Sequence, residues 1–102
     1  MRKIINGKVY NTDTAIKISS YWNGLGNGDF NNLAEALYKS PKGTYFLAGS
    51  GGAKSKYSQS AGQNTWREGS GIYILDEIEA REWLERHGSS EEYEKEFTVE
   101  EG

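Results

Sequence analysis

The chain has 102 residues, of which 12 are Lys or Arg, 15 are Asp or Glu, one is His and none is Cys. This length supports a single globular domain, spanning residues 1–102, and a 35% hydrophobic and 13% aromatic content argues against disorder. The lack of Cys excludes disulfides, thiolate metal sites and Cys nucleophiles. No apolar run approaches the roughly 18 residues that span a bilayer, and the N-terminus does not have the pattern of a signal peptide. We therefore expect a cytoplasmic protein that makes no membrane contact.

The net charge of −3 conceals two halves of opposite charge. Residues 1–75 contain nine basic and four acidic side chains, whereas residues 76–102 contain three basic and eleven acidic ones. This asymmetry indicates a charged partner, because an acidic face fits a basic groove and a basic face attracts phosphates. The alternative interpretation is that the acids only favour helix formation on a solvated face.

The first third of the chain predicts a hairpin, a short helix and a loop. Asn6-Gly7 suits a type I′ turn, and β-favouring residues flank it, so residues 3–10 are predicted to form a β-hairpin. Thr12 or Asp13 is a potential N-cap for a short helix over residues 14–19. Residues 23–29 contain three glycines and are predicted to form a loop.

The middle of the chain predicts a second hairpin and a long loop. Residues 30–38 contain helix formers, and Asp29 would suit as their N-cap, but the alternation of residues 33–40 favours a strand. We expect this strand to be joined by a turn to a strand over 44–48, and one further buried strand over 71–75. Residues 49–71 are rich in Gly and Ser and are expected to form a long loop, which in a small domain is usually functional or mobile.

The C-terminal third predicts two acidic helices, each opened by a capping box: Asp76 with Glu79, and Ser89 with Glu92. Gly88 suits the end of the first helix. Apolar residues in the first helix form a stripe at helical spacing, consisting of Ala80, Trp83, Leu84 and His87. Ile78 lies off this stripe, which indicates that the helix is covered on a second side.

Tyr93 and Phe97 share one face of the second helix, and the tail 98–102 is expected to be loose. The resulting fold class is α+β, with an antiparallel sheet of about five short strands. These strands are the N-terminal hairpin, the central hairpin and one further strand, and a short N-terminal helix and two acidic C-terminal helices complete the fold.

The motifs give little support for catalysis. In the glycine-rich stretch 49–55, Ala48 and Ala53 stand where a Walker A loop needs glycine. His87 has no identifiable nucleophile or orienting partner, and the carboxylates are not spaced as a calcium loop. We therefore expect that the protein is not an enzyme and uses no metal, cofactor or small-molecule substrate.

Two candidate partner-binding surfaces emerge instead. The first is an acidic face on the C-terminal helices, consisting of Asp76, Glu77, Glu79, Glu82, Glu85, Glu91, Glu92, Glu94 and Glu96. The second is a basic loop with interleaved aromatic residues, consisting of Lys54, Lys56, Tyr57, Trp66 and Arg67. Such a loop suits stacking on bases and contacts with phosphates, although Tyr57 and Trp66 would equally serve to pin the loop to the sheet.

Three segments carry a resemblance to known proteins: Lys3–Thr12 (KIINGKVYNT), Tyr45–Ala53 (YFLAGSGGA) and Glu79–Leu84 (EAREWL). Together they resemble a family of small proteins encoded on mobile elements of Gram-positive bacteria, over roughly residues 3–97. The resemblance implies anti-CRISPR activity against type II-A Cas9, by interference with the enzyme or its guide RNA. It assigns no functional residue.

Three interpretations follow for the partner. As a Cas9 inhibitor, the protein would place its acidic face in the positive channel that holds guide and target, or its basic half on the phosphates of the guide RNA. The alternative is a nucleic-acid-binding accessory protein of a plasmid or phage that acts through the basic loop 49–71. A plain interaction module with an unrelated host partner is a third possibility.

Overall fold

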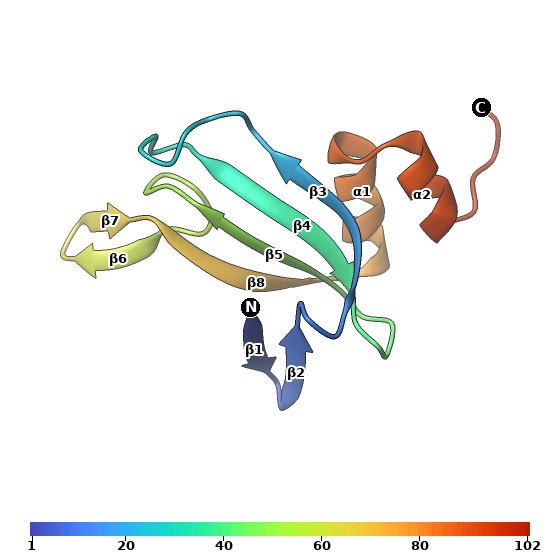
Figure 1. The fold of residues 1–102 in the computed structure, drawn as a ribbon, viewed down its shortest axis with the longest axis horizontal. Helices are drawn as coiled ribbons and strands as arrows, with labels where there is room; N and C mark the ends of the chain where they lie inside the picture. Colours follow the sequence, from blue (N-terminus) through green and yellow to red (C-terminus); the bar gives the residue numbers. More distant parts are fainter.

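A computed structural model of residues 1–102 has an α+β architecture of eight strands and two helices (Figure 1). The strands are β1 (Arg2–Ile5), β2 (Lys8–Asn11), β3 (Ile16–Trp22), β4 (Leu33–Lys39), β5 (Tyr45–Gly51), β6 (Gln59–Gly62), β7 (Thr65–Arg67) and β8 (Gly69–Leu75). The helices are α1 (Glu77–His87) and α2 (Ser90–Glu96). Neither helix is long and apolar enough to cross a bilayer.

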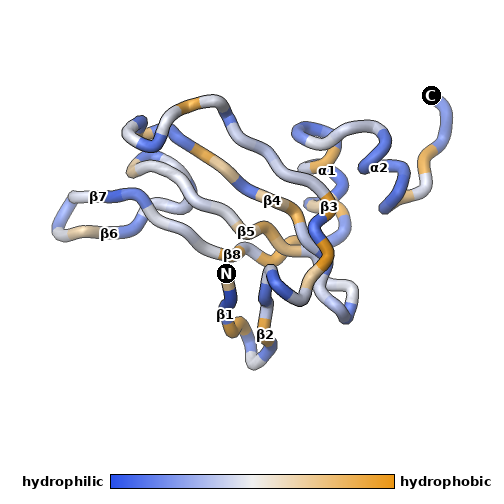
Figure 2. Tube along the Cα trace, in the orientation of Figure 1, coloured by the Kyte–Doolittle hydropathy of each residue, from blue (hydrophilic) through white to orange (hydrophobic).

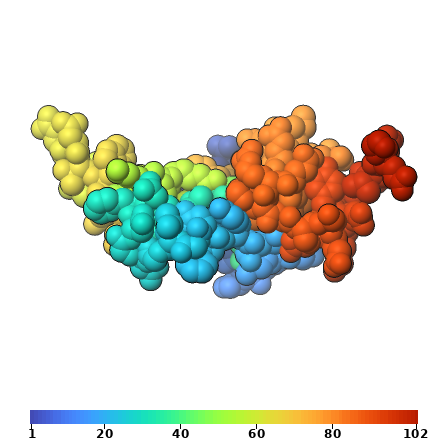
Figure 3. Space-filling model, turned by 90° about the horizontal axis from the view of Figure 1, so that it is seen from above, coloured from blue at the N-terminus to red at the C-terminus, as the bar shows by residue number.

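The centre of the molecule is a four-stranded sheet in the order β3-β4-β5-β8, in which every neighbouring pair is antiparallel. Two separate hairpins, β1–β2 and β6–β7, extend from it. The β6–β7 hairpin projects from the end of the sheet that lies opposite α1 and α2 (Figures 1 and 3). The molecule is therefore elongated, with a longest axis of 48 Å.

The two faces of the sheet carry two separate apolar clusters, because successive side chains of a strand point to opposite faces. On the helix face, residues of β4 and β5 pack against residues of both helices: Leu37, Tyr45, Leu47, Ala80, Trp83, Leu84 and Phe97. On the hairpin face, Tyr10 of β2 packs against Phe46, Ala48 and Ile72. Figure 2 shows that α2 is largely hydrophilic, and the buried apolar residue at this end of the chain is Phe97, which directly follows the helix.

The predicted helix signals are confirmed. The Asp76 side chain accepts a 2.8 Å hydrogen bond from the Glu79 N–H, and the Glu79 side chain accepts one of 3.0 Å from the Asp76 N–H. Ser89 and Glu92 form the same reciprocal pair. The expectation for Ile78 is wrong: its side chain is 66% exposed, so this side of α1 faces solvent.

The predicted helix over residues 14–19 is wrong, since these residues form a turn and the start of β3. The Asp13 N–H donates to Oδ1 of Asn11, and the Ala15 N–H donates to the Asn11 carbonyl, so Asn11 organises a turn instead of a helix start. The β-branched residues that weaken a helix here favour a strand. Pairing with β4 then decides the outcome.

The predicted loop over residues 49–71 is wrong in part, and the sheet strands are longer and more numerous than expected. Strand β5 continues to Gly51, β8 begins at Gly69, and the segment between them contains the β6–β7 hairpin. This hairpin turns at Asn64, which has φ of 57°. Its strands have few β-favouring residues, so sequence patterns did not predict them. The N-terminal hairpin, the central hairpin and the strand before α1 are confirmed.

Candidate partner-binding surfaces

The acidic side chains of α1 and α2 divide into two groups, and the first group makes contacts within the protein. Asp76 and Glu79 complete the cap of α1, and Glu77 lies 3.8 Å from Arg81. Glu96 accepts hydrogen bonds from Lys39 Nζ at 2.9 Å and from the Tyr45 hydroxyl. These four carboxylates therefore stabilise the helices and their attachment to the sheet.

Glu92 belongs to the same group. Its Oε1 accepts hydrogen bonds from the Ser89 N–H and from the Ser19 hydroxyl, both at 2.9 Å. These hydrogen bonds lower the pKa of Glu92, with the Ser89 backbone as the largest cause. Because Ser19 lies on β3, Glu92 fixes α2 to the edge strand of the sheet.

The second group faces solvent. Glu82, Glu91 and Glu94 are exposed and have no hydrogen bond or ion pair within the protein. Glu85 is also exposed and accepts a 3.2 Å hydrogen bond from the Tyr93 hydroxyl. Of the nine acidic residues predicted for this surface, these four are the ones available to a partner.

An open groove of about 1020 Å³ separates α1, α2 and the C-terminal tail. Glu85 and Glu94 line it together with two residues that the sequence prediction did not include, Glu100 and Glu101. Arg81 is the only basic residue in its lining. The tail thus extends the acidic surface beyond the helices, and the clustering of Glu in its last residues was the signal available from the sequence.

The structure separates the five residues of the predicted basic loop. Tyr57 is buried, with 3% exposure, and its hydroxyl donates a 2.7 Å hydrogen bond to Oε2 of Glu35. Lys56 Nζ lies 2.7 Å from the same oxygen. Both residues are therefore engaged within the protein, and Tyr57 holds its loop to the sheet as the structural interpretation predicted.

The other three residues of the basic loop are exposed but do not form one surface. Trp66 is 59% exposed, and Arg67 follows it in β7, so their side chains point to opposite faces of the hairpin. Lys54 lies in the preceding loop, where its N–H donates to the Phe30 carbonyl. Nucleic-acid binding through loop 49–71 would rest on these three residues alone.

Glu35, which the sequence analysis did not single out, is the most heavily engaged polar side chain of the sheet. It is 5% exposed and accepts a 3.0 Å hydrogen bond from Trp83 Nε1 in addition to those from Lys56 and Tyr57. Burial raises the pKa of Glu35, but the hydrogen bonds outweigh burial and hold this pKa below 4.5. A single Glu inside the apolar stretch 33–38 was the sequence signal for this site.

His87 takes part in an aromatic contact and does not belong to a metal-binding cluster. The His87 ring stacks on Tyr21 with 3.9 Å between ring centroids, and burial lowers the pKa of His87 below 6.5. No three His, Asp or Glu side chains lie close enough together to hold a metal ion. The polar cluster around Glu35 is satisfied by its own donors, so its evident role is to join sheet, loop and helix.

No protein-family model matches the chain, and no curated protein or solved structure is significantly similar to it. The class of protein is therefore defined by the geometry alone: a small α+β protein that presents unpaired carboxylates on two helices at one end.

Proposed function

We propose that this protein inhibits type II-A Cas9 by presenting the carboxylates of α1 and α2 to a basic, nucleic-acid-binding surface of the enzyme. The observation that carries the proposal is the exposed set Glu82, Glu85, Glu91 and Glu94, of which three have no partner within the protein. The family resemblance of the sequence supports the choice of Cas9 as the target.

The physical basis is electrostatic complementarity. Cas9 holds its guide and target strands in a positively charged channel, and a matching acidic surface speeds association and selects the correct partner. Both helices are fixed by capping boxes, and α1 is anchored by the buried side chains of Trp83 and Leu84. Little conformational freedom is then lost on binding, which favours affinity.

The test is a DNA-cleavage assay with a type II-A Cas9, in which the protein is added either before or after the guide RNA. Inhibition only when the protein precedes the guide would indicate a block of guide loading. Equal inhibition in both orders would indicate a block of target binding or cleavage. The absence of inhibition in either order, with an enzyme that responds to another inhibitor, would contradict the proposal.

A pair of charge-matched variants tests the surface itself. The variant Glu82→Lys/Glu94→Lys reverses two exposed carboxylates on the helices, and Asp13→Lys/Glu68→Lys reverses two exposed carboxylates elsewhere. Because both variants change the net charge equally, a general charge effect would weaken them equally. We expect inhibition to fall at least tenfold in the helix variant only, and equal inhibition by the two variants would remove the acidic surface from the mechanism.

A further inference from the structure

The unpaired basic residues among the first 42 residues lie on the β1–β2 hairpin, on β3 and on the β4–β5 turn. The three ion pairs of the protein use Lys39, Lys56 and Arg81. Nine bases have no carboxylate within 4.0 Å, and five of these lie within the first 42 residues, where all five are exposed: Arg2, Lys3, Lys8, Lys17 and Lys42. Residues 1–28 contain only one acid, Asp13. We call these five residues the hairpin basic surface.

The strand register brings most of these bases around one aromatic cluster. Lys3 pairs with Tyr10 across the β1–β2 hairpin, and Lys8 stands two residues before Tyr10, so both lysines share its face. Lys17 pairs with Tyr38 on the central sheet. Tyr10 and Tyr38 both pack on the Phe46 ring, with centroids 5.5 Å and 5.4 Å away. Lys3, Lys8 and Lys17 thus flank residues of one aromatic cluster, although they come from two separate segments.

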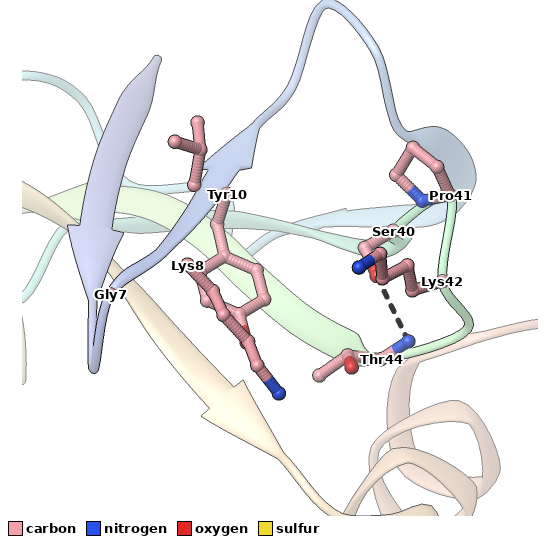
Figure 4. Close-up of a pocket in the computed structure, with 8 residues that line it drawn as sticks. Gly7, Lys8, Tyr10, Ser40, Pro41, Lys42 and Thr44 are labelled. Atoms are coloured by element: carbon pink, nitrogen blue, oxygen red, sulfur yellow. Dashed lines mark hydrogen bonds between the residues drawn. The ribbon is translucent and has the colours of Figure 1, made fainter.

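A pocket of about 360 Å³ lies between the turn of this hairpin and the β4–β5 turn (Figure 4). Lys8 approaches it from the hairpin and Lys42 from the β4–β5 turn, and the hydroxyl residues Ser40 and Thr44 complete its polar lining. No acidic residue lines it. Ser40 Oγ accepts the Thr44 N–H at 3.0 Å, which leaves the Ser40 O–H proton available to a ligand.

Two tight turns hold the walls of this pocket. Asn6 and Gly7 have φ of 52° and 77°, as a type I′ turn requires, and Gly43 has φ of 91° in the other turn. Tyr10 anchors the hairpin wall, since it is only 7% exposed. The two lysines therefore project from a backbone that is already ordered.

We propose that the hairpin basic surface binds the phosphodiester backbone of a nucleic acid, with one phosphate seated in the pocket between Lys8 and Lys42. Several unpaired charges over successive positions match the repeated charges of a nucleic acid backbone. Four of the five bases are lysines, which bind phosphate as point charges. This surface lies on the opposite face of the sheet from α1 and α2, so it is independent of the proposed inhibitory surface.

The test measures fluorescence anisotropy of a labelled single-stranded RNA over a range of salt concentrations, without Cas9. The variant Lys8→Ala/Lys42→Ala is compared with Lys54→Ala/Arg67→Ala, which removes the same charge from loop 49–71. Each phosphate contact contributes about −0.7 to the slope of log K against log salt for a single strand. Because Lys8 and Lys42 hold one phosphate together, we expect the slope to become shallower by about 0.7 in the Lys8/Lys42 variant and to stay unchanged in the control variant.

Competition experiments separate the possible ligands. Inorganic phosphate should displace the RNA more strongly than chloride at equal ionic strength, because the pocket takes a single phosphate. Stronger retention of poly-glutamate than of RNA would overturn the choice of a nucleic acid. Absence of RNA binding, or equal losses in both double variants, would overturn the proposal, and neither result depends on whether the protein inhibits Cas9.

Discussion

The hydroxyl of Tyr57 donates a 2.7 Å hydrogen bond to the carboxylate of Glu35, a residue 22 positions earlier in the chain. The other oxygen of this carboxylate accepts from Trp83 Nε1, so one buried Glu on β4 joins the loop after β5 to helix α1. The ring of Tyr57 lies over Gly49, where a Cβ atom would come within 2.5 Å of it. This junction holds α1, with its acidic face, at a fixed position on the sheet.

Loss of the Glu35 carboxylate is expected to destabilise the protein strongly. In Glu35→Ala the buried donors of Tyr57 and Trp83 lose their acceptor, and each unsatisfied buried donor costs about 1–3 kcal/mol. We expect the free energy of unfolding in urea to fall by about 2–4 kcal/mol. The control Glu68→Ala removes an exposed carboxylate and should change it by less than about 0.5 kcal/mol. Equal effects of the two substitutions would contradict the structural role of Glu35.

The contribution of the Glu35 carboxylate to folding stability depends on pH in the acidic range. Because hydrogen bonds hold the pKa of Glu35 below 4.5 in the folded protein, its contribution is complete above pH 4.5 and is lost as the pH falls through the folded pKa. Urea unfolding curves recorded between neutral pH and pH 3 should therefore show that the free energy of unfolding falls more steeply for the wild-type protein than for Glu35→Gln, which cannot ionise. Parallel curves for the two proteins would exclude Glu35 as the cause.

His87 should titrate below its ordinary range. Burial against Tyr21 lowers the pKa of His87 below 6.5, so the folded state takes up this proton less readily than the unfolded state and stability falls as the pH drops below 6.5. Since His87 is the only His, its ring proton resonance gives the midpoint directly by NMR. Tyr21→Ala removes the stacked ring and should move the midpoint back toward 6.5. A wild-type midpoint at or above 6.5 would contradict this account.

A methyl group at Gly49 should displace the Tyr57 ring. Its Cβ would lie 2.5 Å from Tyr57 Cζ and 2.7 Å from the Ala34 carbonyl oxygen. This oxygen belongs to the backbone of the sheet and cannot move easily. We expect Gly49→Ala to lower stability by about 1–3 kcal/mol, as overpacking does. The matched control is Gly26→Ala, where nothing lies within 4 Å and φ is not positive. Thermal unfolding of both variants checks the prediction.

Two neighbouring carboxylates of α2 should separate stability from partner binding. Glu96 bonds Lys39 and Tyr45, whereas Glu94 has no partner within the protein. Glu96→Gln should reduce the free energy of unfolding by about 1–2 kcal/mol, because the pair is partly buried, while Glu94→Gln leaves it unchanged. If the acidic surface binds a partner, Glu94→Gln should weaken that binding without changing the stability. Urea unfolding curves measure the stability of each variant, and the DNA-cleavage assay measures its inhibition.

Some elements of this protein could be predicted from neighbouring residues alone. Asn6-Gly7 specified its turn because both residues accept positive φ, and the two capping boxes specified where α1 and α2 begin. Each signal depends on contacts within four residues of the chain. Such contacts need no partner that is distant in the sequence, so the sequence is sufficient to predict them.

The remaining features depended on partners that are distant in the sequence. Residues 16–22 became a strand because β4 was there to pair with them, and Trp66 lies on a hairpin whose own residues have weak strand preference. Lys56 and Tyr57 looked available to a ligand until the fold brought them to Glu35, and the hairpin basic surface assembles from three segments. Intrinsic strand propensities of different residues span only about 1 kcal/mol, whereas side-chain burial and strand pairing in the tertiary structure contribute more. The tertiary structure therefore decided which strands formed and which charged side chains remained unpaired.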